Sequence, residues 1–174
     1  MPQLFLFLLF SAGIIYVSLP ALRAGHAYAY YRFLAFEILL VLILVNLELW
    51  FNDPFSPSQL VSWILLLLSI VLVTYGFYLL NELGEPEHGI ETTTVLVSLG
   101  AYKYIRHPLY TSLLALTWGV FFKDPNWIDA ALALIVSALL YFTARAEENE
   151  NVNKFGAEYT QYIKQTKMFI PFLI

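Results

Sequence analysis

The sequence predicts an all-α integral membrane protein, and three observations support this fold class. Hydrophobic side chains make up 60% of the 174 residues and charged side chains only 13%, which is typical of membrane chains. Apolar runs of membrane-spanning length recur along the chain, and nearly all Lys and Arg residues fall on one side of the resulting bundle. Because the length suits one domain, we expect residues 1–174 to form a single integral membrane domain.

Five segments supply the predicted transmembrane helices. A bilayer core of roughly 30 Å requires about 20 mostly apolar helical residues. The segments that meet or approach this length are 4–22, 33–51, 60–80, 108–122 and 127–144. The fourth is short, so it crosses the whole core only where the bilayer thins or its end residues reach toward water.

The connections between these segments carry the signals of helix ends. The first segment is followed by Arg23 and preceded by no basic residue; this is the opposite of a secretory signal, so we expect a retained helix. Residues 52–57 contain two prolines and end the second helix. Residues 123–126, Lys-Asp-Pro-Asn, form a tight turn, which makes the last two helices an antiparallel hairpin.

Positive charge orients the predicted bundle. Lys and Arg accumulate on the cytoplasmic side of membrane proteins. Lys123 falls on one side of the five-helix arrangement, and the other side carries Arg23, Arg32, Lys103, Arg106, Arg145, Lys154, Lys164 and Lys167. We therefore expect the N-terminus outside and the C-terminus in the cytoplasm, in a prokaryotic inner membrane.

The chain becomes polar at residues 145–150, directly after the fifth segment. Apolar side chains then recur at helical spacing, at Val152, Phe155, Tyr159, Tyr162 and Ile163. This spacing predicts an amphipathic helix against the cytoplasmic end of the bundle. Residues 168–174 are apolar but too short to span, and we expect them to return to the membrane interface.

Composition argues against several classes of function. The chain contains no Cys, so it has no disulfide, thiolate nucleophile or Cys-based metal site. His26, His88 and His107 are far apart in the sequence, and we expect no metal centre. The net charge of −4 gives no support for nucleic-acid binding.

The most informative run is residues 100–110, Gly-Ala-Tyr-Lys-Tyr-Ile-Arg-His-Pro-Leu-Tyr, directly before an apolar segment. Pro108 suits the first position of a helix, and the free N–H groups of the following turn attract a carboxylate or phosphate. Arg106 and His107 add donors there. The alternative is membrane anchoring, with Tyr102, Tyr104 and Tyr110 forming an interfacial aromatic belt.

Acidic residues stand at the cytoplasmic end of the fifth predicted helix. The hairpin brings Glu147 and Glu148 close to Pro108. The carboxylates, which accept hydrogen bonds, would then face the donors Arg106 and His107 across one small space. A solvated helix end is the alternative. Elsewhere we expect the acidic loop 82–91 to be solvated. Glu37, Glu48 and Asn46 lie in or near the second predicted helix, and placing polar groups within a membrane span costs free energy.

Three patterns occur in order along roughly the last 80 residues of the chain. They are Gly100-x-Tyr102-x-x-x-Arg106-His107-Pro108-x-Tyr110, Glu147-Glu148, and Phe155-Gly156-x-x-Tyr159-x-x-Tyr162. Together they resemble the isoprenylcysteine carboxyl methyltransferase family and, more loosely, the phospholipid N-methyltransferases. The first three predicted helices match these families only in being apolar.

This resemblance implies a methyltransferase that uses S-adenosylmethionine and accepts a lipid-like or prenylated substrate through a tunnel from the bilayer. The cofactor would lie at the cytoplasmic ends of the last helices, between elements 94–110 and 145–165, closed by the C-terminal helix. The implied cofactor-binding residues are the strand-like lead-in Thr94, Val95, Leu96 and Val97, then Tyr102, Arg106, His107, Pro108, Leu109, Tyr110, Glu147 and Glu148.

The sequence departs from the family pattern at two places. Many members carry an Arg four residues before the paired Glu, and here that position is Thr143. Arg145 is the remaining candidate on the substrate side, and no catalytic residue is assigned. Asn151 stands where an apolar residue usually precedes the Phe-Gly pair. Both departures concern the substrate rather than the cofactor.

The residue types suit this cofactor independently of the resemblance. A helix N-terminus binds a carboxylate, Glu147 binds hydroxyls or an ammonium group, and aromatic faces attract a sulfonium by about 0.5–2 kcal/mol. Two alternatives remain: a membrane reductase of the sterol-reductase type, which uses a nicotinamide dinucleotide, and a non-enzymatic scaffold. The candidate acceptors are a prenylated cysteine, an amine headgroup, a quinone-like molecule or something smaller.

Overall fold

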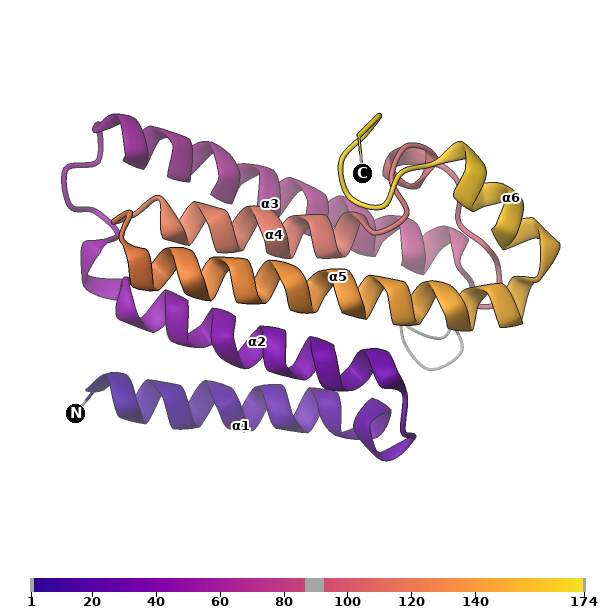
Figure 1. Ribbon diagram of the computed structural model, residues 1–174, viewed down its shortest axis with the longest axis horizontal. Coiled ribbons are helices and arrows are strands. Elements are labelled where there is room, and N and C mark those ends of the chain that lie inside the picture. Colours follow the sequence, from indigo (N-terminus) through magenta and orange to yellow (C-terminus); the bar gives the residue numbers. More distant parts are fainter. Residues whose placement is uncertain (1, 87–92, 174) are drawn as a thin grey trace. The chain divides into compact units, whose positions relative to one another are not determined.

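The computed structural model describes residues 2–86 and 93–173, and the regular secondary structure in these ranges is helical (Figure 1). The helices are α1 (Pro2–Arg23), α2 (Ala27–Val45), α3 (Pro57–Leu83), α4 (Pro108–Phe121), α5 (Trp127–Phe155) and α6 (Ala157–Gln165), with the short 3-10 helices η1 (Leu47–Leu49) and η3 (Gly100–Lys103). The β-structure of the described ranges consists of two isolated bridges, Pro86–Thr93 and Ile105–Lys167. The predicted fold class is confirmed.

Within the described residues, four helices are long and apolar enough to cross a membrane, namely α1, α2, α3 and α5. The fourth predicted segment forms α4, which has 14 residues and is therefore about 21 Å long. This length falls short of a hydrocarbon core of roughly 30 Å. A multi-pass membrane architecture is confirmed, and a fifth crossing by α4 stays a prediction.

The predicted bounds of the second helix, 33–51, are wrong at both ends. The helix already begins at Ala27, because the cationic side chain of Arg32 is buried with its guanidinium over the ring of Tyr28, at 5.2 Å. It ends at Val45, since the side chain of Asn46 donates hydrogen bonds to the Leu42 carbonyl and to Asp129. Glu37 consequently lies inside α2, where it accepts a hydrogen bond from Ser11 at 2.9 Å.

The fifth helix continues to Phe155, well past its predicted end at residue 144. The polar run after Ala144 contains three Glu residues, one Arg and one Lys, all of which favour helix, so the backbone stays helical although the composition changes. Gly156, with φ of 60°, separates α5 from α6. The predicted amphipathic helix is therefore divided between the end of α5 and α6, whose Tyr159 and Tyr162 are buried.

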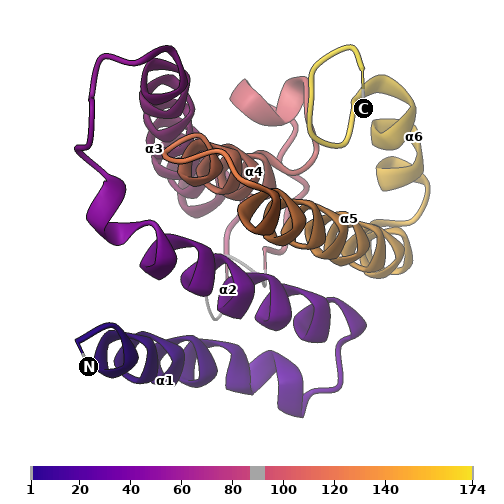
Figure 2. The ribbon, with the colours of Figure 1, turned by 60° about the vertical axis from the view of Figure 1, so that its left-hand side comes forward.

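The chain divides into two compact units, Met1–Leu66 with Leu114–Glu147, and Leu67–Leu113 with Glu148–Ile174. A single domain over residues 1–174 stays a prediction. In the first unit α1 and α2 are antiparallel neighbours (Figure 2). The hairpin between α4 and α5 is closed within the same unit by a hydrogen bond from Trp118 to Ser137, at 3.2 Å.

A buried Lys lies in the turn of this hairpin. Lys123 donates to the side chain of Gln59 at 3.0 Å and to the carbonyl of Trp50 at 3.3 Å. Its ammonium group also lies 3.3 Å from the centre of the Trp63 ring. Burial lowers the pKa of Lys123 below its ordinary value.

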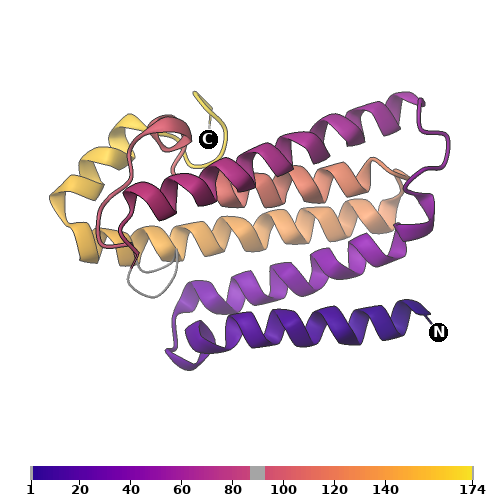
Figure 3. The same cartoon turned by 180° about the vertical axis from the view of Figure 1, so that it is seen from behind.

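The second unit contains η3, α6 and the segment that follows α6, which lie side by side in Figure 3. The phenol of Tyr162 in α6 donates a hydrogen bond of 2.6 Å to the carbonyl of Tyr102 in η3. Tyr102 in turn packs with Leu79 and Val97 in a small apolar cluster. These contacts hold the 100–107 region in place directly before α4.

Candidate functional site

The segment after α6 forms a backbone frame for the Arg-His motif. The N–H of Lys167 donates to the carbonyl of Tyr104 at 3.1 Å. The N–H groups of Arg106 and His107 donate to the carbonyls of Lys167 and Met168, at 2.8 and 3.1 Å. These bonds fix the backbone at Arg106 and His107, whose side chains can both carry a positive charge.

Arg106 forms polar contacts with α5 and with the segment after α6. Its Nε donates to Oε1 of Glu148 at 2.5 Å, and its Nη1 donates to the carbonyl of Thr166 at 2.7 Å. The side chains of Arg106 and Glu148 are only 8% and 4% exposed. A buried charge requires a partner of opposite sign, so each of these two residues neutralises the other.

His107 completes what we call the Arg106–Glu148–His107 cluster. Its Nε2 lies 3.4 Å from the Glu148 oxygen that Arg106 contacts. The imidazole stacks on Tyr110 with 5.4 Å between ring centres, and Phe169 lies 6.2 Å away. The expected convergence of donors before α4 with an acid from α5 is therefore present inside the second unit.

Gly100 and Tyr162 both constrain the chain at η3, shortly before this cluster. Gly100 has φ of 59°, and a Cβ there would lie 2.6 Å from the hydroxyl of Tyr75. Burial raises the pKa of the Tyr162 phenol, and the nearby Tyr159 adds to the shift. The phenol therefore stays protonated and remains the donor to the carbonyl of Tyr102.

The predicted strand-like lead-in is not a strand. Residues 94–97 form bends and irregular extended chain, because the N–H groups of Thr94 and Val95 both donate to the single carbonyl of Gly84 rather than to a neighbouring strand. Val97 is buried and Thr94 is exposed. Residues 87–92, including His88, lie outside the described residues.

The two acidic residues of the Glu-Glu pair have different positions. Glu148 belongs to the second unit and is buried in the cluster, whereas Glu147 is half-buried and belongs to the first unit. Arg145 is exposed. Thr143 is fully buried and donates to the carbonyl of Leu139 within α5. The cofactor and substrate roles of these residues stay predictions.

Sequence reasoning missed the contribution of the segment after α6. Thr166, Met168 and Phe169 contact Arg106, His107 and the first turn of α4. The available signal was the short apolar pair Met168–Phe169 after an amphipathic helix, but spacing alone does not show what it packs against. Sequence reasoning likewise gave no indication that Lys154 donates a hydrogen bond to the carbonyl of Thr93.

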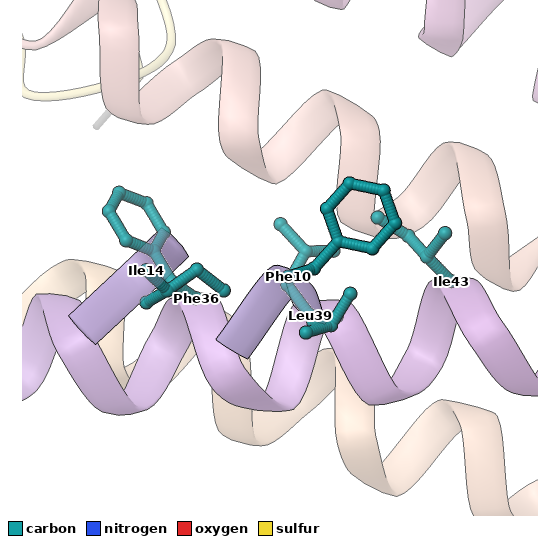
Figure 4. A pocket seen from close by; sticks show the side chains of 6 residues that line it. Phe10, Ile14, Phe36, Leu39 and Ile43 are labelled. Carbon is teal, nitrogen blue, oxygen red and sulfur yellow. The ribbon is translucent and has the colours of Figure 1, made fainter. Parts of the chain in front are cut away.

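An open apolar hollow of about 230 Å³ lies between α1 and α2 in the first unit (Figure 4). It is lined by Phe10, Ile14, Phe36, Leu39, Leu40 and Ile43. None of the predicted site residues lines it. Among the described residues, no group of His, Asp and Glu side chains could hold a metal ion.

The fold and the site together define a multi-pass helical membrane protein with a buried Arg–Glu–His cluster before a short apolar helix. The sequence profile of the phospholipid methyltransferase family matches residues 58–158. This stretch is more than half of the chain, and the chain belongs to that family. The resemblance stated from the motifs is confirmed.

A curated relative gives a second comparison. Methanethiol S-methyltransferase 1 of Bradyrhizobium diazoefficiens is 24% identical over 127 residues, which cover 69% of this chain and 44% of the relative. The chain thus spans less than half the length of that relative. No solved structure matches the chain.

Proposed function

We propose that the protein transfers a methyl group from S-adenosylmethionine to a lipid or lipid-attached acceptor at the cytoplasmic face of a prokaryotic inner membrane. The observation that carries the proposal is the Arg106–Glu148–His107 cluster at the start of α4. Membership of a methyltransferase family and the apolar helices support it. The orientation rests on the Lys and Arg distribution.

The residues present fit this cofactor in their chemistry. The N–H groups of the first turn of α4 suit its carboxylate, and the rings of Tyr102, Tyr110 and His107 suit adenine and the positively charged sulfur. The residues that would hold the cofactor are those named above in 94–110, together with Glu147 and Glu148. When bound, it supplies a methyl group on an activated carbon.

The protein's own contribution is to orient groups and exclude water. Glu148 holds Arg106 and His107 in fixed positions, and the backbone frame from Lys167 and Met168 restrains them further. Holding reactants in line is worth about 7–11 kcal/mol at best. A carboxylate acceptor requires no general base, and we assign none.

The acceptor has two candidate classes. Exposed apolar side chains along α1 and α3 favour a lipid-like or prenylated acceptor that arrives from the bilayer and carries a carboxylate or amine. The name of the Bradyrhizobium relative states that it methylates methanethiol, so a small thiol is the second class. Arg145 is the candidate on the acceptor side.

Calorimetric titration of the detergent-purified protein with S-adenosylmethionine tests the cofactor. We expect saturable binding that weakens at least tenfold in Glu148→Gln and His107→Ala, while Glu158→Gln on the exposed face of α6 binds like the wild type. Folded wild-type protein that binds no S-adenosylmethionine but saturates with a reduced nicotinamide dinucleotide supports the reductase alternative. Binding of neither compound supports the scaffold.

Transfer of a radiolabelled methyl group then tests the acceptor. The enzyme is incubated with labelled cofactor and with a lipid extract, a prenylated cysteine or methanethiol. Label in the organic phase with the lipid or the prenylated cysteine supports the lipid-like class. Label appearing only as a volatile thioether supports the small thiol.

A further inference from the structure

The segment after α6 divides into a buried and an exposed half. Met168 and Phe169 are each 6% exposed, whereas Ile170, Phe172 and Leu173 are 48%, 83% and 70% exposed. Phe172 also has φ of 68°, a left-handed conformation that bulky residues rarely adopt. Three apolar side chains are thus presented outward from irregular chain, where water is an unfavourable environment.

This segment lies beside the first turn of α4. The hydroxyl of Thr111 lies within hydrogen-bonding distance, 3.0 Å, of the carbonyl of Phe169, and the N–H of His107 donates to the carbonyl of Met168. The helix that starts there contains no charged residue from Pro108 to Phe121. We expect such an apolar helix to begin at the edge of the hydrocarbon core, which would bring the exposed side chains to the level of the membrane boundary.

The charges around the segment match a phospholipid surface. Lys103 and Lys167 flank Tyr104, which is half exposed and whose ring lies 6.5 Å from that of Phe172. No Asp or Glu occurs in residues 93–107 or 166–173. Apolar and aromatic side chains combined with Lys form the pattern of interfacial anchors, in which Lys contacts lipid phosphates.

We propose that Ile170, Phe172 and Leu173 insert into the membrane surface at which α4 begins, and that this contact supports the Arg106–Glu148–His107 cluster. The same short segment performs both tasks. Its Lys167 and Met168 carbonyls accept the backbone hydrogen bonds of Arg106 and His107. Lipid contact therefore restrains the segment in the conformation that holds the cluster.

The absence of Cys from the chain permits a direct test by site-specific spin labelling. Phe172→Cys and Leu173→Cys are labelled in vesicles of phosphatidylethanolamine and phosphatidylglycerol, with Gln161→Cys on the exposed face of α6 as control. We expect labels at 172 and 173 to be accessible to oxygen and shielded from a water-soluble nickel chelate. The label at 161 should be accessible to nickel.

Two results would overturn the insertion. Nickel accessibility at 172 and 173 equal to that at 161 would place the segment in water. Shielding from both oxygen and nickel would show that protein covers it, either another copy of the chain or another partner. Neither measurement depends on cofactor binding, so it decides insertion even if the proposed function fails.

The coupling to the cluster rests on the proposed function and is tested separately. We expect S-adenosylmethionine to bind several-fold more tightly in vesicles than in detergent, and the double variant Phe172→Ser, Leu173→Ser to lose this difference. Gln161→Ser should retain it. An unchanged ratio in the double variant would refute the coupling, as would a wild-type affinity that is the same in both media.

Discussion

The Nε–H of Arg106 donates to Oε1 of Glu148 across 2.5 Å, joining the residues before α4 to the polar end of α5. The two residues are separated by 42 positions in the chain. Because both side chains are almost completely buried, the pair is costly to break and geometrically restrictive. The site therefore depends on the charge balance between Arg106 and Glu148.

Removing the charge of Glu148 should destabilise the protein strongly. In Glu148→Gln the guanidinium of Arg106 stays buried without a counter-charge, which costs about 3–5 kcal/mol. A fall in the thermal unfolding midpoint of the purified protein measures this loss. Glu158→Gln, at an exposed position of α6, should change stability by no more than about 0.5 kcal/mol. Equal midpoints for the two variants would contradict the pairing.

Gly100 should tolerate no side chain. Ala at this position would adopt an unfavourable positive φ and place its Cβ 2.6 Å from the Tyr75 hydroxyl, so we expect a loss of about 1–3 kcal/mol. Gly13→Ala is the matched control, because its Cβ would meet nothing within 4 Å. That helical substitution should be neutral or stabilising. Adding Tyr75→Phe to Gly100→Ala removes the contact with the hydroxyl but leaves the Leu79 side chain 2.8 Å from the new Cβ, so we expect stability to recover only in part.

Tyr162 should make stability depend on pH in the alkaline range. Its pKa is raised in the folded state by burial, whereas the unfolded chain releases the proton near about pH 10. The contribution of this group is fully present below that pH and declines as pH rises above it. Unfolding midpoints between pH 9 and 11.5 should fall more steeply for the wild type than for Tyr162→Phe. Parallel curves would disprove this assignment.

The contact between Asn46 and Asp129 should stabilise the first unit. Their side chains hydrogen-bond at 2.8 Å and are about 1% exposed, so Asn46→Ala leaves a buried carboxylate with fewer donors. The expected cost is about 1–3 kcal/mol, measured as a lower unfolding midpoint. Glu48→Ala, at an exposed position of η1, should have little effect. A larger fall in the unfolding midpoint for Glu48→Ala than for Asn46→Ala would contradict this prediction.

Much of the architecture could be predicted from local composition. The positions of α1, α3 and α4 follow from apolar runs bounded by Arg23, Pro57 and Pro108. Hydrocarbon thickness determines how many apolar residues a span requires, which accounts for the lengths of α1 and α3. The second helix begins before its predicted first residue, 33, because Arg32 lies inside the helix and not at its end. Stacking on Tyr28 buries its charge and lets the helix begin earlier.

The sequence by itself determined the membrane class, most helix positions and the methyltransferase family, since each depends on residue types at short spacings. Only the tertiary structure decided that Glu148 rather than Glu147 meets Arg106, because adjacent helical residues point about 100° apart and packing selects which one faces inward. It also decided that Lys167 and Met168 support the motif some 60 positions earlier. Hydrogen bonds between backbone segments so far apart in the chain require no particular residue spacing, so the sequence gives no pattern that predicts them.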